Sequence, residues 1–208
     1  IFENFQYLKI RYKNKIYKIR INLYGSIQIK NLFMAILASK VCGVKIENVF
    51  NKIHKIKSVE GRLQLVKILN KNTKVFLDYA HTPEALDKAI LSLREHFNKK
   101  ISVIFGCGGE RDKSKRKLMG KIASKYCDKI YITDDNPRSE DASKIRKDII
   151  KGVNHPFVRE IGNRKKAIIY ALKNSNFHEI ILIAGKGHEN YQDLGKKRIF
   201  LSDKTIVK

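Results

Sequence analysis

The chain has 208 residues, of which 43% are hydrophobic and 31% are charged. This apolar content is enough for a folded core, which excludes general disorder, and no apolar run reaches the length of about 18 residues that predicts a membrane-spanning helix. Lysine and arginine outnumber aspartate and glutamate by 44 to 20, for a formal net charge of +24. The basic residues are spread over the whole chain, so we interpret them as a solvated surface. A basic nucleic-acid-binding domain is the less favoured alternative.

Three scattered cysteines, Cys42, Cys107 and Cys127, form no Cys-x-x-Cys pair. The sequence therefore predicts no metal site and no disulfide framework, and an odd number of thiols fits a reducing, cytoplasmic compartment. The first residues lack the basic segment and the cleavage site of a signal peptide. Because the chain begins with Ile1 rather than methionine, we expect it to be cut from something longer.

The first part of the chain predicts a hairpin followed by two helices. Alternating apolar and polar residues indicate the strands, and apolar residues at helical spacing indicate the helices. The strands cover 8–13 and 16–22, and the helices cover 31–40 and 46–56. The first helix is almost entirely apolar, which predicts that it is buried. Residues 58–62 look like a boundary, because the pattern changes after them.

Beyond this boundary, strands alternate with helices, which predicts an α/β fold with a doubly wound, mainly parallel sheet. The predicted strands are 63–69, 75–77, 101–105, 129–133, 157–161 and 179–184. The predicted helices are 83–97, 118–126, 141–151 and 167–172. The clearest helix start is Thr82 followed by Pro83, an N-cap residue with proline at the first helical position.

Four loops follow the carboxyl ends of predicted strands, at 78–83, 106–112, 134–140 and 185–191. Each loop carries charged or glycine-rich sequence. Because the carboxyl ends of parallel strands lie on one edge of a sheet, we expect the four loops to converge on a ligand site. Neither a dinucleotide fingerprint nor a P-loop is present, since Arg111 interrupts one glycine pattern and Ser or Thr follows neither Gly-Lys pair.

The loop 134–140 has the composition of an amino-acid site. Pro137 stiffens the turn, and Arg138 follows the carboxylates Asp134 and Asp135 closely. An arginine fork binds a carboxylate and a carboxylate binds an ammonium group, so the loop suits a zwitterionic ligand. On its own the loop would more simply be a turn with Ser139 as a helix N-cap. The convergence of four such loops favours the ligand site.

Five sequence motifs, in order and at fitting spacing, resemble the carboxyl-terminal part of the Mur ligases. The matching runs are Gly61-Arg62-Leu63, Asp78-Tyr79-Ala80-His81-Thr82-Pro83, Gly106-Cys107-Gly108-Gly109-Glu110-Arg111-Asp112, Asp135-Asn136-Pro137-Arg138 and Ala184-Gly185-Lys186-Gly187-His188-Glu189. The resemblance covers essentially the whole chain. It implies that residues 1–57 end the central ATP-binding domain and that residues 58–208 form the amino-acid-binding carboxyl-terminal domain.

Within the family, the chain looks like the members that use ATP to add meso-diaminopimelate to UDP-MurNAc-L-Ala-D-Glu during peptidoglycan precursor synthesis. The resemblance implies that ATP is contacted by Asn31, Arg62 and Asp78. It also implies that meso-diaminopimelate is bound by Arg111, Asp135, Asn136, Pro137, Arg138, Gly185 and Glu189. No residue of this chain is assigned a catalytic role.

These implied roles make chemical sense. Arg111 and Arg138 can each take a carboxylate, and Glu189 can take an ammonium group. A buried guanidinium at Arg138 would favour meso-diaminopimelate over lysine, which lacks the second carboxylate. Lysine-adding and folylpolyglutamate-type ligases are the alternatives within the superfamily, and the Arg138 loop argues against both.

The chain lacks several parts that the family uses, namely the UDP-binding domain, the P-loop and the carbamylated lysine that helps to hold Mg²⁺. We therefore expect the Mg²⁺ ligands to lie in the missing amino-terminal and central segments. Those segments, rather than a membrane or a nucleic acid, are the expected partners, and the chain alone is expected to be inactive.

Overall fold

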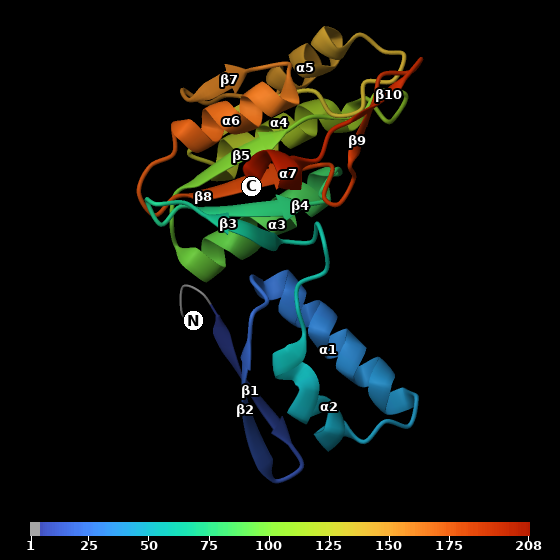
Figure 1. Cartoon of the computed structure of the whole chain (residues 1–208), viewed down its shortest axis with the longest axis vertical. Coiled ribbons are helices and arrows are strands. Elements are labelled where there is room, and N and C mark those ends of the chain that lie inside the picture. The colour runs from blue at the N-terminus through green and yellow to red at the C-terminus, as the bar shows by residue number, and fades with distance from the viewer. Residues whose placement is uncertain (1–4) are drawn as a thin grey trace.

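The predicted hairpin begins the part of the chain that the computed structural model describes, which is residues 5–208. Residues 1–4 of the predicted 1–57 domain lie outside that part. Strand β1 (Gln6–Tyr12) pairs antiparallel with β2 (Lys15–Ile21) in full register. Figure 1 shows this hairpin and the first two helices as a narrow amino-terminal unit beside a larger α/β unit.

Helix α1 (Ser26–Val41) is longer and less buried than the sequence predicts. It begins five residues before the predicted start at 31, directly after Gly25, which has a φ of 79°. The prediction that it is buried is wrong. Only its Gln28, Leu32 and Ile36 are buried, whereas Met34 and Leu37 are 66% and 54% exposed. In an almost uniformly apolar segment, the sequence has no periodicity that distinguishes the inner face from the outer one.

The amino-terminal unit has its own small core. Helix α2 (Ile46–Lys52) and the 3₁₀ turn η1 (Ile53–Lys55) follow α1 and pack with it against the hairpin. The buried cluster is aliphatic apart from Phe50, and partly buried Tyr12 and Tyr17 pack on that ring. The predicted helix 46–56 is therefore present as a helix with a 3₁₀ end.

The predicted α/β sheet is confirmed, with six strands in the order β3-β4-β8-β5-β6-β7. The strands are β3 (Gln64–Ile68), β4 (Lys74–Asp78), β5 (Ile101–Phe105), β6 (Lys129–Ile132), β7 (Val158–Glu160) and β8 (Ile180–Ala184). All neighbours pair in parallel except β3, which runs antiparallel to β4 at one edge. The sheet is thus mainly parallel, with an antiparallel edge that alternation alone does not predict.

Helices cover both faces of the sheet, as the doubly wound pattern predicts (Figure 1). One face packs on α3 (Pro83–Phe97), α4 (Ser114–Tyr126) and α5 (Ala142–Ile150), and the other packs on α6 (Arg164–Lys173) and the short α7 (Asp203–Val207). Strand β8 shows how one strand serves both cores. Its Ile180 and Leu182 lie in one cluster and its Ile181 and Ile183 in the other. Strands buried on both faces read as continuous apolar runs, which is why these strands were predictable.

The last 18 residues contain three short elements that the sequence does not predict. Strands β9 (Tyr191–Asp193) and β10 (Arg198–Phe200) form a small hairpin, and α7 closes the chain. Each strand has only three residues, too few to show a period. No helix in residues 5–208 is both long and apolar enough to cross a membrane.

The two units meet where the start of α1 contacts α3. Gly25 N donates to Nδ1 of the buried His96 at 3.4 Å, and Ser26 Oγ donates to Glu95 at 3.0 Å. A Cβ on Gly25 would lie 2.7 Å from the Ser92 Cβ, so only glycine allows this approach. Tyr24 packs edge-on against His96 and so extends the α/β core toward the amino-terminal unit.

His96 makes this contact sensitive to acid, because burial lowers its pKa from 6.5 to about 4. In the unfolded chain, His96 binds a proton as the pH falls through about 6.5, whereas in the folded chain it does so only near pH 4. The associated stability is therefore present above pH 6.5 and is lost as the pH falls toward 4, by up to about 1.4 kcal/mol per pH unit. Urea unfolding between these pH values should show that His96→Gln reduces the pH dependence of the free energy of unfolding. His54→Gln, at an exposed histidine, should leave that dependence unchanged. Equal slopes for the wild-type chain and His96→Gln would contradict this account.

Candidate functional site

The four predicted loops do converge, at the edge of the sheet where β4, β5, β6 and β8 end. A cleft of about 750 Å³ is lined by residues of all four loops. It is lined by six of the seven residues that were predicted to bind the amino acid, namely Arg111, Asp135, Asn136, Arg138, Gly185 and Glu189. Pro137 is buried behind them and does not line the cleft.

A second cleft, of about 450 Å³, brings together the three residues predicted for ATP. Asn31 comes from α1, Arg62 from the segment between the two units, and Asp78 from the end of β4. Ile27, Leu63, Ala85 and Ala89 give the cleft an apolar lining. Thr82 and Glu84, at the start of α3, line both clefts, so the two are adjacent. An apolar lining with a few polar groups is typical of small-molecule sites.

Asp78 also has a structural role that the sequence does not reveal. Its two carboxylate oxygens accept hydrogen bonds from the backbone N–H groups of Leu63 and Ala80, both at 2.8 Å. Burial raises the pKa of the Asp78 carboxyl above its ordinary value, and the two backbone bonds oppose that shift. Asp78 therefore fixes the start of the α/β unit, where Leu63 has a φ of 41°, as well as lining the cleft.

The two carboxylates of loop 134–140 have different surroundings. Asp134 pairs with Arg146 of α5, and burial raises the pKa of its carboxyl. The expectation that both carboxylates flank Arg138 is therefore wrong for Asp134. Asp135 lines the cleft, where its Oδ1 accepts the Asn136 N–H at 2.7 Å.

Arg138 is held in place by the loops on either side of it. Its φ is 52°, its N–H donates to Asp193 O at 3.0 Å, and its Nη1 donates to Gly109 O at 2.6 Å. Gly109 must be glycine, because a Cβ there would lie 2.0 Å from Pro137 O. Arg138 is partly buried in the cleft, and the burial of its guanidinium by a bound amino acid stays a prediction.

The glycine-rich loop is tied to loop 134–140 by acidic side chains. Glu110 accepts a hydrogen bond from the Ser139 hydroxyl, and Glu140 pairs with the buried Arg116 of α4 at 2.9 Å. The Glu110 N–H, together with Arg116, lowers the pKa of Glu140. Ser139 is not the N-cap of α5, because Asp141 has that role. Ser139 instead joins the two loops.

Asn136 and Glu189 line the first cleft, and the buried Lys186 joins them from behind. Asn136 Nδ2 donates to Glu189 Oε2 at 3.1 Å, and Lys186 Nζ donates to the same oxygen at 3.1 Å. Gly185 also needs to be glycine, since its φ is 110° and a Cβ would lie 2.6 Å from Asp135 Oδ2. Sequence reasoning rejected Gly185-Lys186 as a P-loop and matched both residues to a family motif, but it assigned no role to Lys186.

A buried ion pair supports the cleft from behind. Arg164, at the start of α6, donates to both oxygens of Asp203, at 2.8 and 2.7 Å. It also donates to Ala184 O at 3.0 Å, and its Nη1 lies 4.0 Å from Asp135 Oδ2. Sequence reasoning missed this pair, because its partners are 39 residues apart and Asp203 lies in an unpredicted helix.

A group of aromatic rings surrounds Tyr79, which lines the first cleft. The Arg62 guanidinium is 4.7 Å from the centre of the Tyr79 ring. The ring centres of His81 and His188 lie 4.7 and 5.7 Å from the same point. Both histidines are exposed. They contact an aromatic residue at the mouth of the cleft and have no cluster of metal-binding neighbours. No group of three or more His, Cys, Asp or Glu side chains within residues 5–208 is placed to hold a metal ion.

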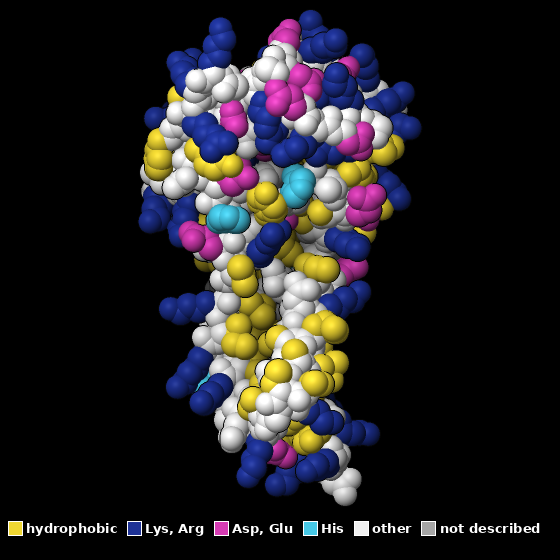
Figure 2. Space-filling model, turned by 90° about the vertical axis from the view of Figure 1, so that its right-hand side faces the viewer, with side chains coloured by type: hydrophobic (Ala, Val, Ile, Leu, Met, Phe, Trp, Pro, Cys, Tyr) yellow, Lys and Arg dark blue, Asp and Glu magenta, His cyan; other side chains and the backbone are white. Residues whose placement is uncertain are grey.

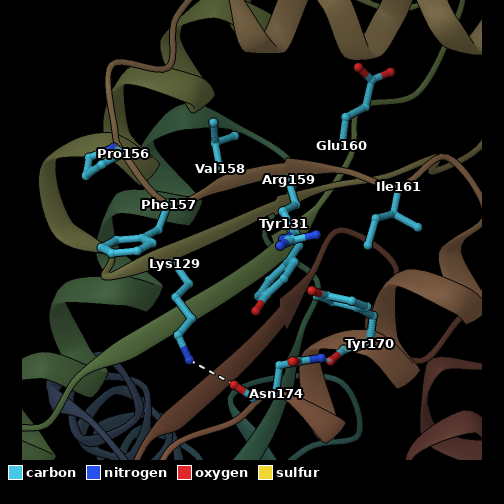
Figure 3. A pocket seen from close by; sticks show the side chains of 10 residues that line it. All are labelled: Lys129, Tyr131, Pro156, Phe157, Val158, Arg159, Glu160, Ile161, Tyr170 and Asn174. Carbon is cyan, nitrogen blue, oxygen red and sulfur yellow. Dashed lines mark hydrogen bonds between the residues drawn. The ribbon is translucent and has the colours of Figure 1, made fainter.

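A further hollow lies at the open edge of the sheet beside β7 (Figure 3). Its basic groups already have partners. Lys129 Nζ donates to Asn174 O at 2.9 Å, and the Arg159 guanidinium lies 4.9 Å from the centre of the Tyr170 ring. This hollow gathers none of the predicted site residues.

The charged surface does not form a single basic stripe on the face seen in Figure 2. Lysine and arginine are interspersed there with aspartate and glutamate, and hydrophobic side chains gather on the amino-terminal unit. A continuous basic stripe would have favoured a nucleic-acid partner.

In a comparison with protein families, residues 61–187 fit the family model described as "Mur ligase, glutamate ligase domain". Two curated relatives, from Rickettsia montanensis and Rickettsia conorii, are both named UDP-N-acetylmuramoyl-L-alanyl-D-glutamate--2,6-diaminopimelate ligase. They are 42% and 43% identical to this chain over 205 residues, 98% of its length and 42% of theirs. The chain thus spans about two fifths of the length of the curated relatives it matches.

Solved structures show the same similarity. A structure of a ligase with that name matches 94% of this chain and 40% of its own, with a TM-score of 0.70 and 32% identity. A UDP-N-acetylmuramate-alanine ligase from Thermotoga maritima has a TM-score of 0.66 at 19% identity. A folylpolyglutamate synthase from Mycobacterium tuberculosis has a TM-score of 0.65 at 20% identity. These last two share the fold.

Proposed function

Because the chain belongs to the Mur ligase family, we propose that it is the amino-acid-binding part of an ATP-dependent ligase. In this proposal the ligase adds meso-diaminopimelate to UDP-MurNAc-L-Ala-D-Glu in peptidoglycan precursor synthesis. Relatives that carry the corresponding name match nearly the whole chain at 42–43% identity, which supports this member of the family. The site of action would be the cytoplasm. We call a protein of the relatives' length, with this chain as its carboxyl-terminal part, the full-length ligase.

The observation that carries the proposal is the charge pattern of the first cleft. Arg111 and Arg138 line it together with Asp135 and Glu189, so guanidinium groups and carboxylates share one space. Glu84, Asp112 and Lys115 add further charge to the lining. meso-Diaminopimelate carries two carboxylates and two amino groups, one of each at either end. Each end therefore has a complementary pair of groups in the cleft.

The proposed binding roles follow from this pairing. Arg138 takes the distal carboxylate, since its Nη1 is held by Gly109 O and no hydrogen bond within residues 5–208 engages its other side-chain nitrogens. Arg111, which is exposed at the rim, takes the other carboxylate. Glu189 and Asp135 receive ammonium groups, while Asn136, Pro137 and Gly185 shape the wall.

The second cleft suits the base and ribose of ATP, the nucleotide that the family uses. Its apolar lining would receive the base, and Asn31, Arg62 and Asp78 would supply polar contacts at its rim. The described residues include no P-loop and no cluster for a metal ion, so the phosphates and Mg²⁺ would be held by other segments of the full-length ligase. When bound, ATP supplies the phosphoryl group that activates a carboxylate for amide formation. This chain's part is to bring the attacking amine next to the nucleotide.

The exposed apolar face of α1 supports the proposal that residues 1–57 belong to a larger ATP-binding domain. Phe33, Met34, Leu37 and Val41 are all exposed on this helix. Contiguous exposed apolar patches usually mark an interface. In the full-length ligase, the rest of the central domain would cover this face.

The proposed function is tested by asking which amino acid the full-length ligase requires. Phosphate release from ATP is measured with UDP-MurNAc-L-Ala-D-Glu and, in turn, meso-diaminopimelate, L-lysine and L-glutamate. The proposal expects substantial release with meso-diaminopimelate alone. Equal or faster release with lysine or glutamate would contradict it.

Arg62 tests the nucleotide cleft more cleanly than Asp78, because its side chain is exposed and Asp78 also holds backbone groups. Arg62→Ala removes a guanidinium from the rim and its contact with the Tyr79 ring. We expect the KM for ATP to rise by about tenfold, the effect of about 1.4 kcal/mol, with the KM for the amino acid within about twofold. Arg11→Ala, on an exposed position of the hairpin, is the matched control. A larger change in the KM for the amino acid than in the KM for ATP would show that the assignment of Arg62 to the nucleotide cleft is wrong.

A further inference from the structure

Lys186 is a lysine whose side chain is fully buried in the wall of the amino-acid cleft. None of its side-chain surface is exposed, whereas Glu189, its ion-pair partner, retains 17% exposure. A buried ammonium group is costly unless it is paired and hydrogen-bonded. The contacts that compensate Lys186 are therefore informative.

Lys186 Nζ has two oxygen partners and one aromatic neighbour. It donates to Asn136 Oδ1 and to Glu189 Oε2, both at 3.1 Å, and it lies 5.2 Å from the centre of the Tyr191 ring. Both oxygens belong to residues of the proposed amino-acid site. Lys186 itself does not line the cleft.

The first consequence concerns the orientation of the Asn136 amide. Its Oδ1 accepts from Lys186 and from the Asp193 N–H at 3.0 Å, so this end of the amide must be the oxygen. The Nδ2 end then points to Glu189, to which it donates at 3.1 Å. Lys186 and the Asp193 N–H together set which end of the amide faces Glu189.

The second consequence concerns the Glu189 carboxylate. Its Oε2 receives two donors, Lys186 and Asn136. Its Oε1 is much less occupied, because within residues 5–208 its one hydrogen-bond donor is the Tyr79 hydroxyl at 3.5 Å. One oxygen is therefore anchored in the wall, and the other remains available on a residue that lines the cleft.

Charge neutralisation alone does not explain this arrangement. Glu189 is partly exposed and could be solvated without a buried cation, and an apolar residue at the position of Lys186 would avoid the desolvation of an ammonium group. A lysine here contributes a fixed direction to two neighbouring polar groups.

We propose that Lys186 is a positioning residue that orients the Glu189 carboxylate, both directly and through the Asn136 amide, to receive the ammonium group of the incoming amino acid. The inference rests on the proposed function, because it concerns the same cleft. Lys186 acts through these two residues and does not touch the ligand.

The test is Lys186→Met in the full-length ligase, with steady-state kinetics for each substrate. Methionine keeps the length of the side chain and removes the charge and the donors. The KM for meso-diaminopimelate should rise by about 10- to 100-fold, the range expected for one charge-assisted hydrogen bond. The KM for ATP should stay within about twofold. Lys151→Met is the matched control, because Lys151 makes the same type of i,i+3 pair, with Asp148, on the surface.

A double-mutant cycle with Glu189→Gln separates positioning from a loss of folding. The double variant Lys186→Met/Glu189→Gln leaves no unpaired charge in the wall, so it should fold even where Lys186→Met alone is unstable. If Lys186 acts through Glu189, the double variant has about the same amino-acid KM as Glu189→Gln alone. In Lys186→Ala, n-propylammonium should partly restore the KM, and n-propanol should not.

Two results separate the possible failures. Wild-type ligase that does not use meso-diaminopimelate contradicts the proposed function and, with it, the role of Lys186. Wild-type turnover combined with an unchanged amino-acid KM in Lys186→Met, or with fully additive effects in the cycle, overturns the positioning role alone.

Discussion

Arg138→Ala in the full-length ligase is expected to reduce the preference for meso-diaminopimelate over L-lysine by about 10- to 100-fold. Lysine lacks the distal carboxylate, so it leaves the guanidinium without an anion. Removing one partner of a fully buried charged pair costs about 2–5 kcal/mol. Arg138 is half-buried and already donates to Gly109 O, so we expect a smaller cost than for a fully buried pair, about 1.4–2.8 kcal/mol. The measurement is the ratio of the two kcat/KM values in the wild-type ligase and the variant.

Arg138→Lys is the informative control for this prediction. A lysine keeps the positive charge but cannot form the two-pronged contact with a carboxylate. It should recover only part of the preference. If the ratio is the same in the wild-type ligase and in Arg138→Ala, Arg138 has no part in selectivity, and the assignment to meso-diaminopimelate loses its main chemical support.

Asp203→Ala is expected to lower the free energy of unfolding by about 3–5 kcal/mol, the cost of leaving a buried charge without its partner. Asp203 is 1% exposed and accepts two hydrogen bonds from Arg164, which is also 1% exposed. The loss should also release α7 from α6 and disturb Asp135, whose Oδ2 lies 4.0 Å from Arg164. Urea unfolding of the purified chain measures the change.

Glu47→Ala is the matched control, since it removes an exposed ion pair with Lys13 at 3.9 Å. Exposed pairs contribute about 0–1 kcal/mol, so this variant should unfold almost like the wild-type chain. A loss below about 1 kcal/mol in Asp203→Ala would show that the buried pair does not hold the end of the chain in place.

The sequence predicted the strands that are buried on both faces and the edge at which the site lies. The strand predicted at 101–105 is β5 with the same bounds. The loops after β4, β5, β6 and β8 meet as expected, because the topology of parallel strands requires it. Local pattern was sufficient for these features, since continuous apolar runs and turn residues are encoded within a few positions.

Features that depend on distant partners were not predictable. Asp134 and Asp135 are adjacent in sequence, yet one pairs with Arg146 and the other lines the cleft. Ser139 is a residue type that often serves as an N-cap, but its hydroxyl donates to Glu110 in the glycine-rich loop instead. Lys186 belongs to a Gly-Lys pair that does not meet the P-loop pattern. Its proposed role depends on Asn136, which is 50 residues away in the sequence. The division into domains at residue 57 remains a prediction, supported by the separate core of the amino-terminal unit.

The most direct test is a crystal structure of the full-length ligase with meso-diaminopimelate bound. The account predicts that the distal carboxylate lies within hydrogen-bond distance of the Arg138 guanidinium, with an ammonium group on Glu189 Oε1, in the cleft at the strand ends. An amino acid bound outside this cleft, or one with its distal carboxylate away from Arg138, would contradict it.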